Sequence, residues 1–297
     1  MGSNGNTTEL EVVNYDLLAA RDTDEIQKLV QAATGRGIFF LDLRGPLAET
    51  AVADLKPILK AQRKFFAQPI EEKEVYSSDL PERGLVRLFI LSPSCNCMHI
   101  LTFYRYEEFD HASAETLLVC PPIQPLGLPN LIVNIQLSRE EEVDGTLKIP
   151  KDLQPVTEKL KNVSSFSDTA MRDLVSILST TLSPPVPTGA INNPSKPGKS
   201  NLTLGLASAP AGTDLIPSHA DSGIITILYY DTPTLEILEP VTQEWEVVQP
   251  VEGLHVVYVG QALQALSNGR LVAALHRVKQ PKDSTAMVVY LLHPGEE

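Results

Sequence analysis

The sequence contains few cysteines, no long apolar run and no basic leader. Cys95, Cys97 and Cys120 are its three cysteines, and an odd number without a framework spacing indicates a reduced compartment rather than a disulfide scaffold. Cys95 and Cys97 lack a second cysteine pair with which to form a zinc site. The polar start and the lack of a segment long enough to cross a bilayer predict a cytoplasmic protein without membrane partners.

Basic residues are also scarce relative to acidic ones. Lysine and arginine number 24 against 37 aspartates and glutamates, which gives a formal net charge of −13. This charge would repel phosphate backbones and anionic lipid surfaces, so we expect no nucleic-acid partner. A chain of 297 residues with 43% apolar residues can bury a substantial core. These properties favour a globular protein that acts on a small molecule, and they leave the oligomeric state open.

The first part of the chain, residues 1–187, is predicted to be mainly helical with one early strand. The pattern predicts helices near 22–33, 47–66 and 167–182, the second one kinked or divided by Pro57, and a strand over 38–43. The segment 104–150 is rich in proline and is predicted to be irregular, with a solvated turn at 139–142. This region is expected to pack around the second part rather than to fold alone.

The second part, residues 188–297, has the pattern of a β-structure. Short apolar segments separated by glycine, proline and aspartate predict strands at 202–207, 224–230, 235–238, 245–248, 255–259, 271–279 and 285–292. Regular short strands of this kind are typical of a jelly roll or barrel. We therefore predict an α+β fold in which N-terminal helices flank a jelly-roll core, the two parts forming one structural unit.

One set of residues predicts a metal site: His219 and Asp221, followed far along the chain by His276. In an extended strand, side chains two positions apart point to the same face, so His219 and Asp221 can converge while Ala220 points away. His276 would arrive from a later strand. Two imidazoles and one carboxylate suit a facial iron(II) site, which leaves three adjacent coordination positions for O2 and organic ligands. The motif alone has low specificity.

The surrounding residues carry a family resemblance. Segments 219–228, 235–238, 245–248, 259–261, 266–270 and 276–278, together with 36–41 and 65–73, resemble in order the isopenicillin N synthase-like family of iron(II) and 2-oxoglutarate-dependent dioxygenases. Only the middle of the chain, about 84–147, diverges from that family. The resemblance implies a double-stranded β-helix core and assigns His219, Asp221 and His276 as iron ligands.

The departures from the family concern the cosubstrate. The family's Arg-x-Ser motif, which holds the far carboxylate of 2-oxoglutarate, is replaced here by Thr285, Ala286 and Met287, and the family's tyrosine is absent from 204–210. Losing a charge-assisted bidentate pair weakens binding by about a hundredfold or more. A replacement cation could come from nearby residues, namely Arg270, Arg277, Lys279 and Lys282. Gln261 stands where the family commonly has an aspartate, which removes an acidic group near the iron.

Two mechanisms remain compatible with the triad. Either 2-oxoglutarate still binds as cosubstrate, or the substrate itself binds iron(II) and supplies the electrons for O2 reduction; Met287 fits the second better. Both describe a non-haem iron(II) oxygenase or oxidase that hydroxylates, desaturates or cyclises a small organic substrate, by family analogy in secondary metabolism. The alternative is a degenerate family member that binds a ligand or partner without turnover. His255 is interpreted as a core or surface histidine rather than a ligand.

Overall fold

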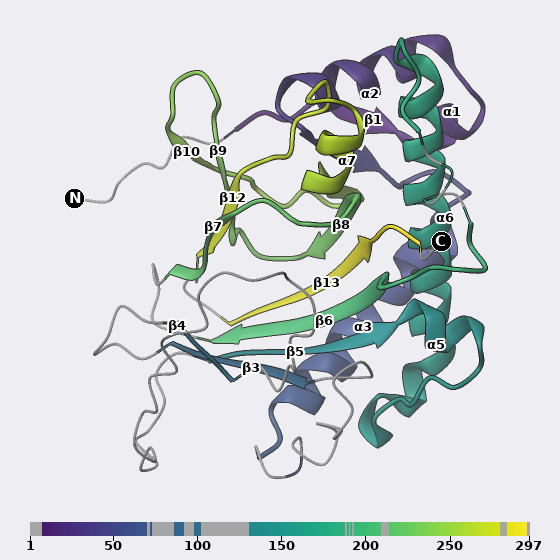
Figure 1. Ribbon diagram of the computed structural model, residues 1–297. Coiled ribbons are helices and arrows are strands. Elements are labelled where there is room, and N and C mark those ends of the chain that lie inside the picture. The colour runs from purple at the N-terminus through teal and green to yellow at the C-terminus, as the bar shows by residue number, and fades with distance from the viewer. Residues whose placement is uncertain are drawn as a thin grey trace, which may run out of the picture.

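A computed structural model of the chain describes residues 8–69, 72, 86–91, 98–101, 131–187, 189, 191, 193–208, 214–279 and 284–295. The strands form two sheets, and a layer of helices packs against the larger sheet (Figure 1). No helix within these ranges has the length and apolar character needed to span a membrane.

The larger sheet draws its strands from nearly the whole chain. In spatial order they are β1 (Val12–Asn14), β2 (Ile38–Asp42), β11 (Leu254–Val259), β8 (Ile225–Tyr230), β13 (Thr285–Leu292), β6 (Asn201–Ser208), β5 (Leu131–Ser138), β3 (Val86–Leu91) and β4 (Met98–Leu101). All neighbours pair antiparallel except β1 and β2, which run parallel. Strands distant in sequence lie side by side in this sheet, as β2 and β11 do.

The smaller sheet carries two of the predicted metal ligands. Its strands, in spatial order, are β10 (Trp245–Val247), β9 (Leu235–Leu238), β12 (His276–Lys279) and β7 (Asp214–His219). It faces the larger sheet, because one apolar cluster contains side chains from both. The buried members of this inner cluster include Phe40, Leu228, Val256 and Tyr258 from the larger sheet and Leu235 and Ile237 from the smaller one.

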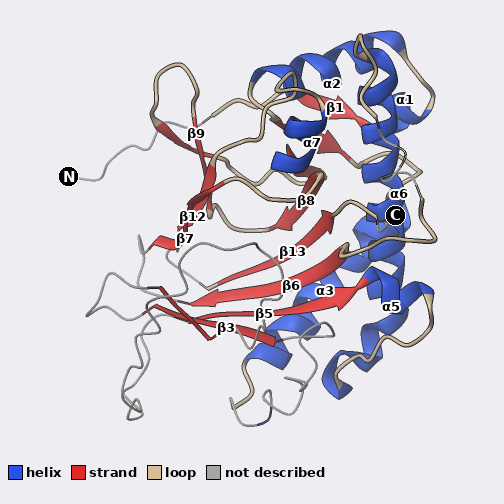
Figure 2. Cartoon of the chain, viewed as in Figure 1, coloured by secondary structure: helices blue, strands red, loops and turns tan. Residues whose placement is uncertain are grey.

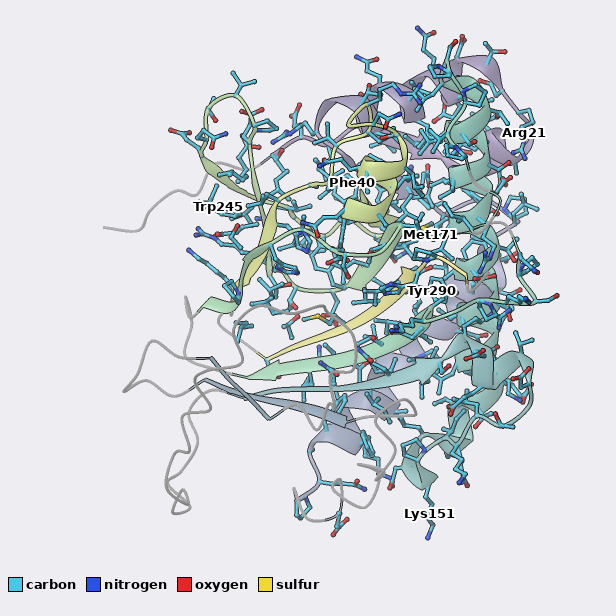
Figure 3. The ribbon with its side chains drawn as sticks, viewed as in Figure 1. Arg21, Phe40, Lys151, Met171, Trp245 and Tyr290 are labelled. Carbon is cyan, nitrogen blue, oxygen red and sulfur yellow. The ribbon has the colours of Figure 1, made fainter. Side chains whose placement is uncertain are left out.

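The helices cover the opposite face of the larger sheet. They are α1 (Tyr15–Ala19), α2 (Thr23–Gly35), α3 (Glu49–Phe66), α5 (Arg139–Val143), α6 (Thr157–Thr181) and α7 (Gln261–Leu266), with a short 3₁₀ helix at Lys151–Val156. Figure 2 shows α2, α3 and α6 gathered on one side and β9 and β12 on the other. Met171 of α6 and Tyr290 of β13, both labelled in Figure 3, belong to the core between helices and sheet.

The predicted α+β jelly roll with flanking helices is confirmed by this arrangement. Helix α2 begins as predicted, because the Asp22 side chain accepts a hydrogen bond from the backbone N–H of Glu25. The boundary predicted at residue 187 stays a prediction.

Several predicted elements differ in the structure. Helix α3 is not divided at Pro57; its buried face packs against α6 and β13, and this packing outweighs the lost backbone hydrogen bond. Helix α6 begins ten residues before the predicted start at 167, at Thr157. Within 104–150, the segment predicted to be irregular, the structure has strand β5.

The turn predicted at 139–142 is instead the short helix α5. It is solvated in part, because Glu140 and Val143 are exposed. Arg139 and Glu142, in contrast, form an ion pair at 2.6 Å with side chains 14% and 9% exposed. The Glu142 carboxylate also accepts a hydrogen bond from Ser164 on α6. One face of the short helix therefore contacts α6 and the other faces solvent.

The strand predicted over 271–279 is shorter than expected. Residues 271–275 are not part of the ladder, because the backbone N–H of Val272 donates to Ala33 and that of Ala273 donates to the side chain of Gln264. Gly37, at φ +70°, brings its Cα so close to the Val272 carbonyl that a Cβ would lie 1.7 Å from the oxygen. The strand therefore begins at His276, which is one of the three predicted metal ligands.

Candidate metal centre

The three predicted ligands meet at the edge of the smaller sheet. His219 ends β7, Asp221 follows two residues later, and His276 opens β12. His276 and His219 are directly paired in the ladder between these strands, so their imidazoles project from the same place. One ligand atom from each of the three residues lies within 4.8 Å of the others. Asp221 lies just beyond the strand rather than on it, which differs from the single extended segment predicted from the sequence.

The donor atoms face one another with the correct chemistry for a divalent transition metal. Oδ1 of Asp221 lies 3.5 Å from Nε2 of His219 and 3.7 Å from Nε2 of His276. Each imidazole donates a hydrogen bond from Nδ1 to a backbone carbonyl, His219 to Pro217 at 2.9 Å and His276 to Ala274 at 3.1 Å. These bonds fix the tautomer and leave the Nε2 lone pairs for a metal. The residues therefore fit iron(II), the metal that the resemblance implies.

The carboxylate of Asp221 is held by a neighbouring threonine. Thr226 Oγ1 on β8 donates to Asp221 Oδ2 at 2.6 Å, and Thr226 is only 1% exposed. Oδ2 is thereby occupied, whereas Oδ1 points to the two imidazoles. The arrangement presents one carboxylate oxygen to a metal.

Gly260 allows the loop that contains Asp221 to pack closely against the start of α7. A Cβ on Gly260 would lie 2.1 Å from the carbonyl oxygen of Gly223 and 3.1 Å from that of Asp221. The backbone N–H of Gln261 donates to the Asp221 carbonyl at 2.7 Å. The Gln261 side chain is exposed, so its contribution to this loop comes from the backbone.

Electrostatics favour the metal-binding protonation state at two of the three residues. Burial raises the pKa of Asp221, but His219, the nearby His276 and the Thr226 hydroxyl together bring it below its usual value. Burial lowers the pKa of His276. Burial also opposes protonation of His219, yet its contacts with Asp221 and Pro217 raise its pKa overall. A divalent metal binds an ionised carboxylate and neutral imidazoles, so at His219 it would compete with a proton.

Tyr258 was not predicted from the sequence to be near the site, but its ring packs against His276 with centroids 4.5 Å apart. Tyr258 on β11 is the ladder partner of Thr226 on β8, so the two side chains share one face of the larger sheet. The alternation of side chains along one strand predicts the face of the sheet to which each residue points. Only the register between β11 and β8 places Thr226 and Tyr258 side by side, next to His219, Asp221 and His276.

The positions that replace the cosubstrate motif carry no charge. Thr285 is fully buried, and its hydroxyl forms a hydrogen bond with that of Thr232. Met287 packs against Leu215 and Val278. Opposite Met287 on β6 stands Gly205, where a Cβ would lie 3.1 Å from Met287 Cγ. Met287 therefore occupies room that the missing side chain of Gly205 provides.

The nearby cations have other partners in the structure. Arg277 Nε donates to Glu236 at 2.6 Å and its guanidinium stacks 4.0 Å from the Trp245 ring centroid, while Lys279 lies 3.5 Å from the same carboxylate. Arg270 Nε donates to the Ser267 carbonyl at 2.8 Å. A role for Arg270 in cosubstrate binding stays a prediction, and Lys282 lies outside the described residues.

The remaining histidines and cysteines do not join the cluster among the described residues. His255 is buried against Tyr229, with ring centroids 4.7 Å apart, and burial lowers its pKa to about 4. It is a core histidine, as the sequence suggested. The cysteines and His111 lie outside the described residues, as do the side chains of β4, which include His99.

Comparison with known proteins agrees with this geometry. Residues 197–294 match the sequence model of the 2OG-Fe(II) oxygenase superfamily. The chain is 24% identical over 281 residues to the 2-oxoglutarate-dependent dioxygenase FG08081 of Gibberella zeae, covering 92% of this chain and 74% of that protein. It is also 24% identical over 297 residues to the 2-oxoglutarate-dependent dioxygenase ecdG of Aspergillus rugulosus, covering 96% and 81%.

Residues 197–294 thus carry the sequence pattern of a 2OG-Fe(II) oxygenase, and both fungal relatives, similar over most of the chain, are named as 2-oxoglutarate-dependent dioxygenases. The fold of this oxygenase resembles that of full-length Neurospora crassa T7H, solved in complex with alpha-KG, at a TM-score of 0.69 and 16% identity, over 99% of this chain and 87% of that one. The family predicted from the sequence is thereby confirmed, and with it the enzyme class of non-haem iron(II) dioxygenases.

Proposed function

We propose that this oxygenase holds iron(II) through His219, Asp221 and His276 and oxidises a small organic substrate with O2. The observation that carries the proposal is the convergence of three ligand atoms within 4.8 Å, with both imidazoles turned so that Nε2 faces Asp221 Oδ1. Iron(II) held by such a triad keeps adjacent coordination positions for O2 and an organic ligand. The outcome would be hydroxylation, desaturation or oxidative cyclisation, and a secondary metabolite is the substrate class that family analogy suggests.

The ligand assignment is tested by iron(II) affinity without turnover. His276→Ala removes one of three ligands, and we expect a loss of iron(II) affinity of at least about a hundredfold in an anaerobic competition titration with a chelator. His255→Leu is the matched control, because it removes a buried histidine from the face that packs against the helices. Equal iron(II) affinity in His276→Ala and in the unaltered protein would overturn the assignment.

We further propose that 2-oxoglutarate binding is atypical or absent. Support comes from the buried, hydrogen-bonded Thr285, from the apolar Met287, and from the Glu236 carboxylate that engages Arg277 and Lys279. An anionic carboxylate placed against Met287 would lose water without gaining a charged partner from these residues. The relatives are named for 2-oxoglutarate dependence, and this chain differs from the family motif at the residues that determine that binding.

The cosubstrate is tested by two linked measurements. We expect anaerobic titration of 2-oxoglutarate into the iron(II)-loaded protein to give weak binding, and O2 consumption across a panel of amino-acid, peptide and polyketide substrates to be independent of added 2-oxoglutarate. Succinate release coupled to substrate oxidation would overturn this part of the proposal. The double variant Thr285→Arg with Met287→Ser restores the family motif and should tighten 2-oxoglutarate binding by about a hundredfold.

A further inference from the structure

Tyr258 has a hydroxyl group that the fold does not use. Its ring lies against the His276 ring, with centroids 4.5 Å apart, and it is 5% exposed. None of the described residues forms a hydrogen bond with this hydroxyl, and its electrostatic neighbours are Asp221 and Tyr230. This oxygen is not among the fully buried polar atoms that lack a partner in the described residues, so the hydroxyl remains reachable and can donate to a bound molecule.

The neighbouring polar groups have partners of their own. The Tyr230 hydroxyl donates to the Val248 carbonyl at 3.0 Å, and it forms no hydrogen bond with Tyr258. In Asp221, Oδ2 accepts the Thr226 hydrogen bond and Oδ1 faces the two imidazoles. The Tyr258 hydroxyl is therefore a hydrogen-bond donor held beside the triad and left without an acceptor among the described residues.

The surroundings of this donor are apolar. On the same face of the larger sheet, the residues next to Tyr258 and Thr226 are three aliphatic ones that pair across neighbouring strands, Val256, Leu228 and Val289. These residues belong to the inner cluster between the sheets. A molecule that enters here meets aliphatic side chains and a single phenolic donor near the metal ligands.

We propose that the Tyr258 hydroxyl donates a hydrogen bond to an oxygen atom of the small molecule bound beside the triad. The ligand class is therefore an apolar molecule that carries a carbonyl, carboxylate or hydroxyl oxygen at the end nearest the metal. This inference rests on the proposed function, because it takes the triad as the place where the small molecule binds. It adds a residue that contacts the ligand and fixes its orientation.

The test separates the hydroxyl from the ring. Tyr258→Phe keeps the packing on His276, and two probes share a benzyl group: phenylpyruvate presents oxygen atoms to the metal, whereas benzyl mercaptan presents sulfur, a weak acceptor. In anaerobic calorimetry with iron(II)-loaded protein, the variant should bind phenylpyruvate about threefold to tenfold more weakly and benzyl mercaptan within about twofold of the unaltered protein. The thermal midpoint of the metal-free variant should not fall, because no protein hydrogen bond is lost.

Tyr229→Phe is the matched control. Tyr229 is equally buried on the opposite face of β8, and its hydroxyl forms a 2.8 Å hydrogen bond with Ser167 of α6. This variant should lower the thermal midpoint and leave the affinity of both probes unchanged, the reverse of the pattern expected for Tyr258→Phe.

Three results would overturn the inference. Unchanged phenylpyruvate affinity in Tyr258→Phe means that the hydroxyl contacts no ligand, and equal weakening of both probes means that the residue acts through packing. A lower thermal midpoint of the metal-free variant means that the hydroxyl has a structural partner. Failure of the unaltered protein to bind iron(II) is a separate outcome, which overturns the proposed function and with it the site.

Discussion

Replacing Thr226 by valine tests how the triad is held in place. Thr226→Val has nearly the same shape and removes only the hydroxyl that donates to Asp221 Oδ2 at 2.6 Å. Because Thr226 is 1% exposed, water cannot easily replace the lost donor. The carboxylate then keeps its charge but loses the contact that orients Oδ1 toward the imidazoles.

The magnitude follows from the type of hydrogen bond. A bond to a charged group contributes about 1.5–3 kcal/mol, and hydrogen bonds that orient metal ligands commonly account for about tenfold to a hundredfold in metal affinity. A hundredfold corresponds to about 2.7 kcal/mol, so the two ranges agree. We expect Thr226→Val to weaken iron(II) binding by about tenfold to a hundredfold, less than the loss of a ligand.

The assay is an anaerobic competition titration of iron(II) against a chelator. Thr234→Val is the control, since Thr234 is also buried (3% exposed) and precedes β9 in the smaller sheet. Its iron(II) affinity should equal that of the unaltered protein. If Thr226→Val binds iron(II) within about twofold of the unaltered protein, Thr226 does not orient Asp221 and the reasoning fails.

Three further predictions concern the loop and the core. Gly260→Ala should weaken iron(II) binding, because its Cβ would lie 2.1 Å from a loop oxygen, whereas Gly35→Ala, with no atom within 4 Å, should not. His255 has a pKa of about 4 in the folded protein, so the unfolded chain binds more protons below pH about 6.5. Stability should fall by up to about 3 kcal/mol between pH 6.5 and 4, and His255→Leu should remove this part of the slope. Tyr290→Phe loses the 2.6 Å hydrogen bond to buried Asp168 and should lower the free energy of unfolding by about 1.5–3 kcal/mol in urea titration.

Each of these has a result that contradicts it. Equal iron(II) affinity in both glycine variants would show that the loop adapts without moving Asp221. An unchanged acid slope in His255→Leu would assign the loss of stability to other groups. An unaltered urea midpoint in Tyr290→Phe would mean that Asp168 keeps enough donors without the phenol.

The sequence predicted the strands of the jelly roll well where a short apolar run is bounded by turn residues, as in β8 and β13. It failed at 271–275, where the apolar run resembles a strand but its backbone bonds to Ala33 and Gln264. It also treated Arg139 and Glu142 as solvated, because the contact of Glu142 with Ser164 of α6 is not visible in a sequence.

By itself, the sequence predicted the three metal ligands and determined the loss of the Arg-x-Ser motif, since both depend on residue type at a fixed spacing. Only the tertiary structure decided that His276 pairs with His219 and that Thr226 pairs with Tyr258. The physical reason is that side-chain alternation is a property of one strand, whereas register is set between strands that lie far apart in the chain.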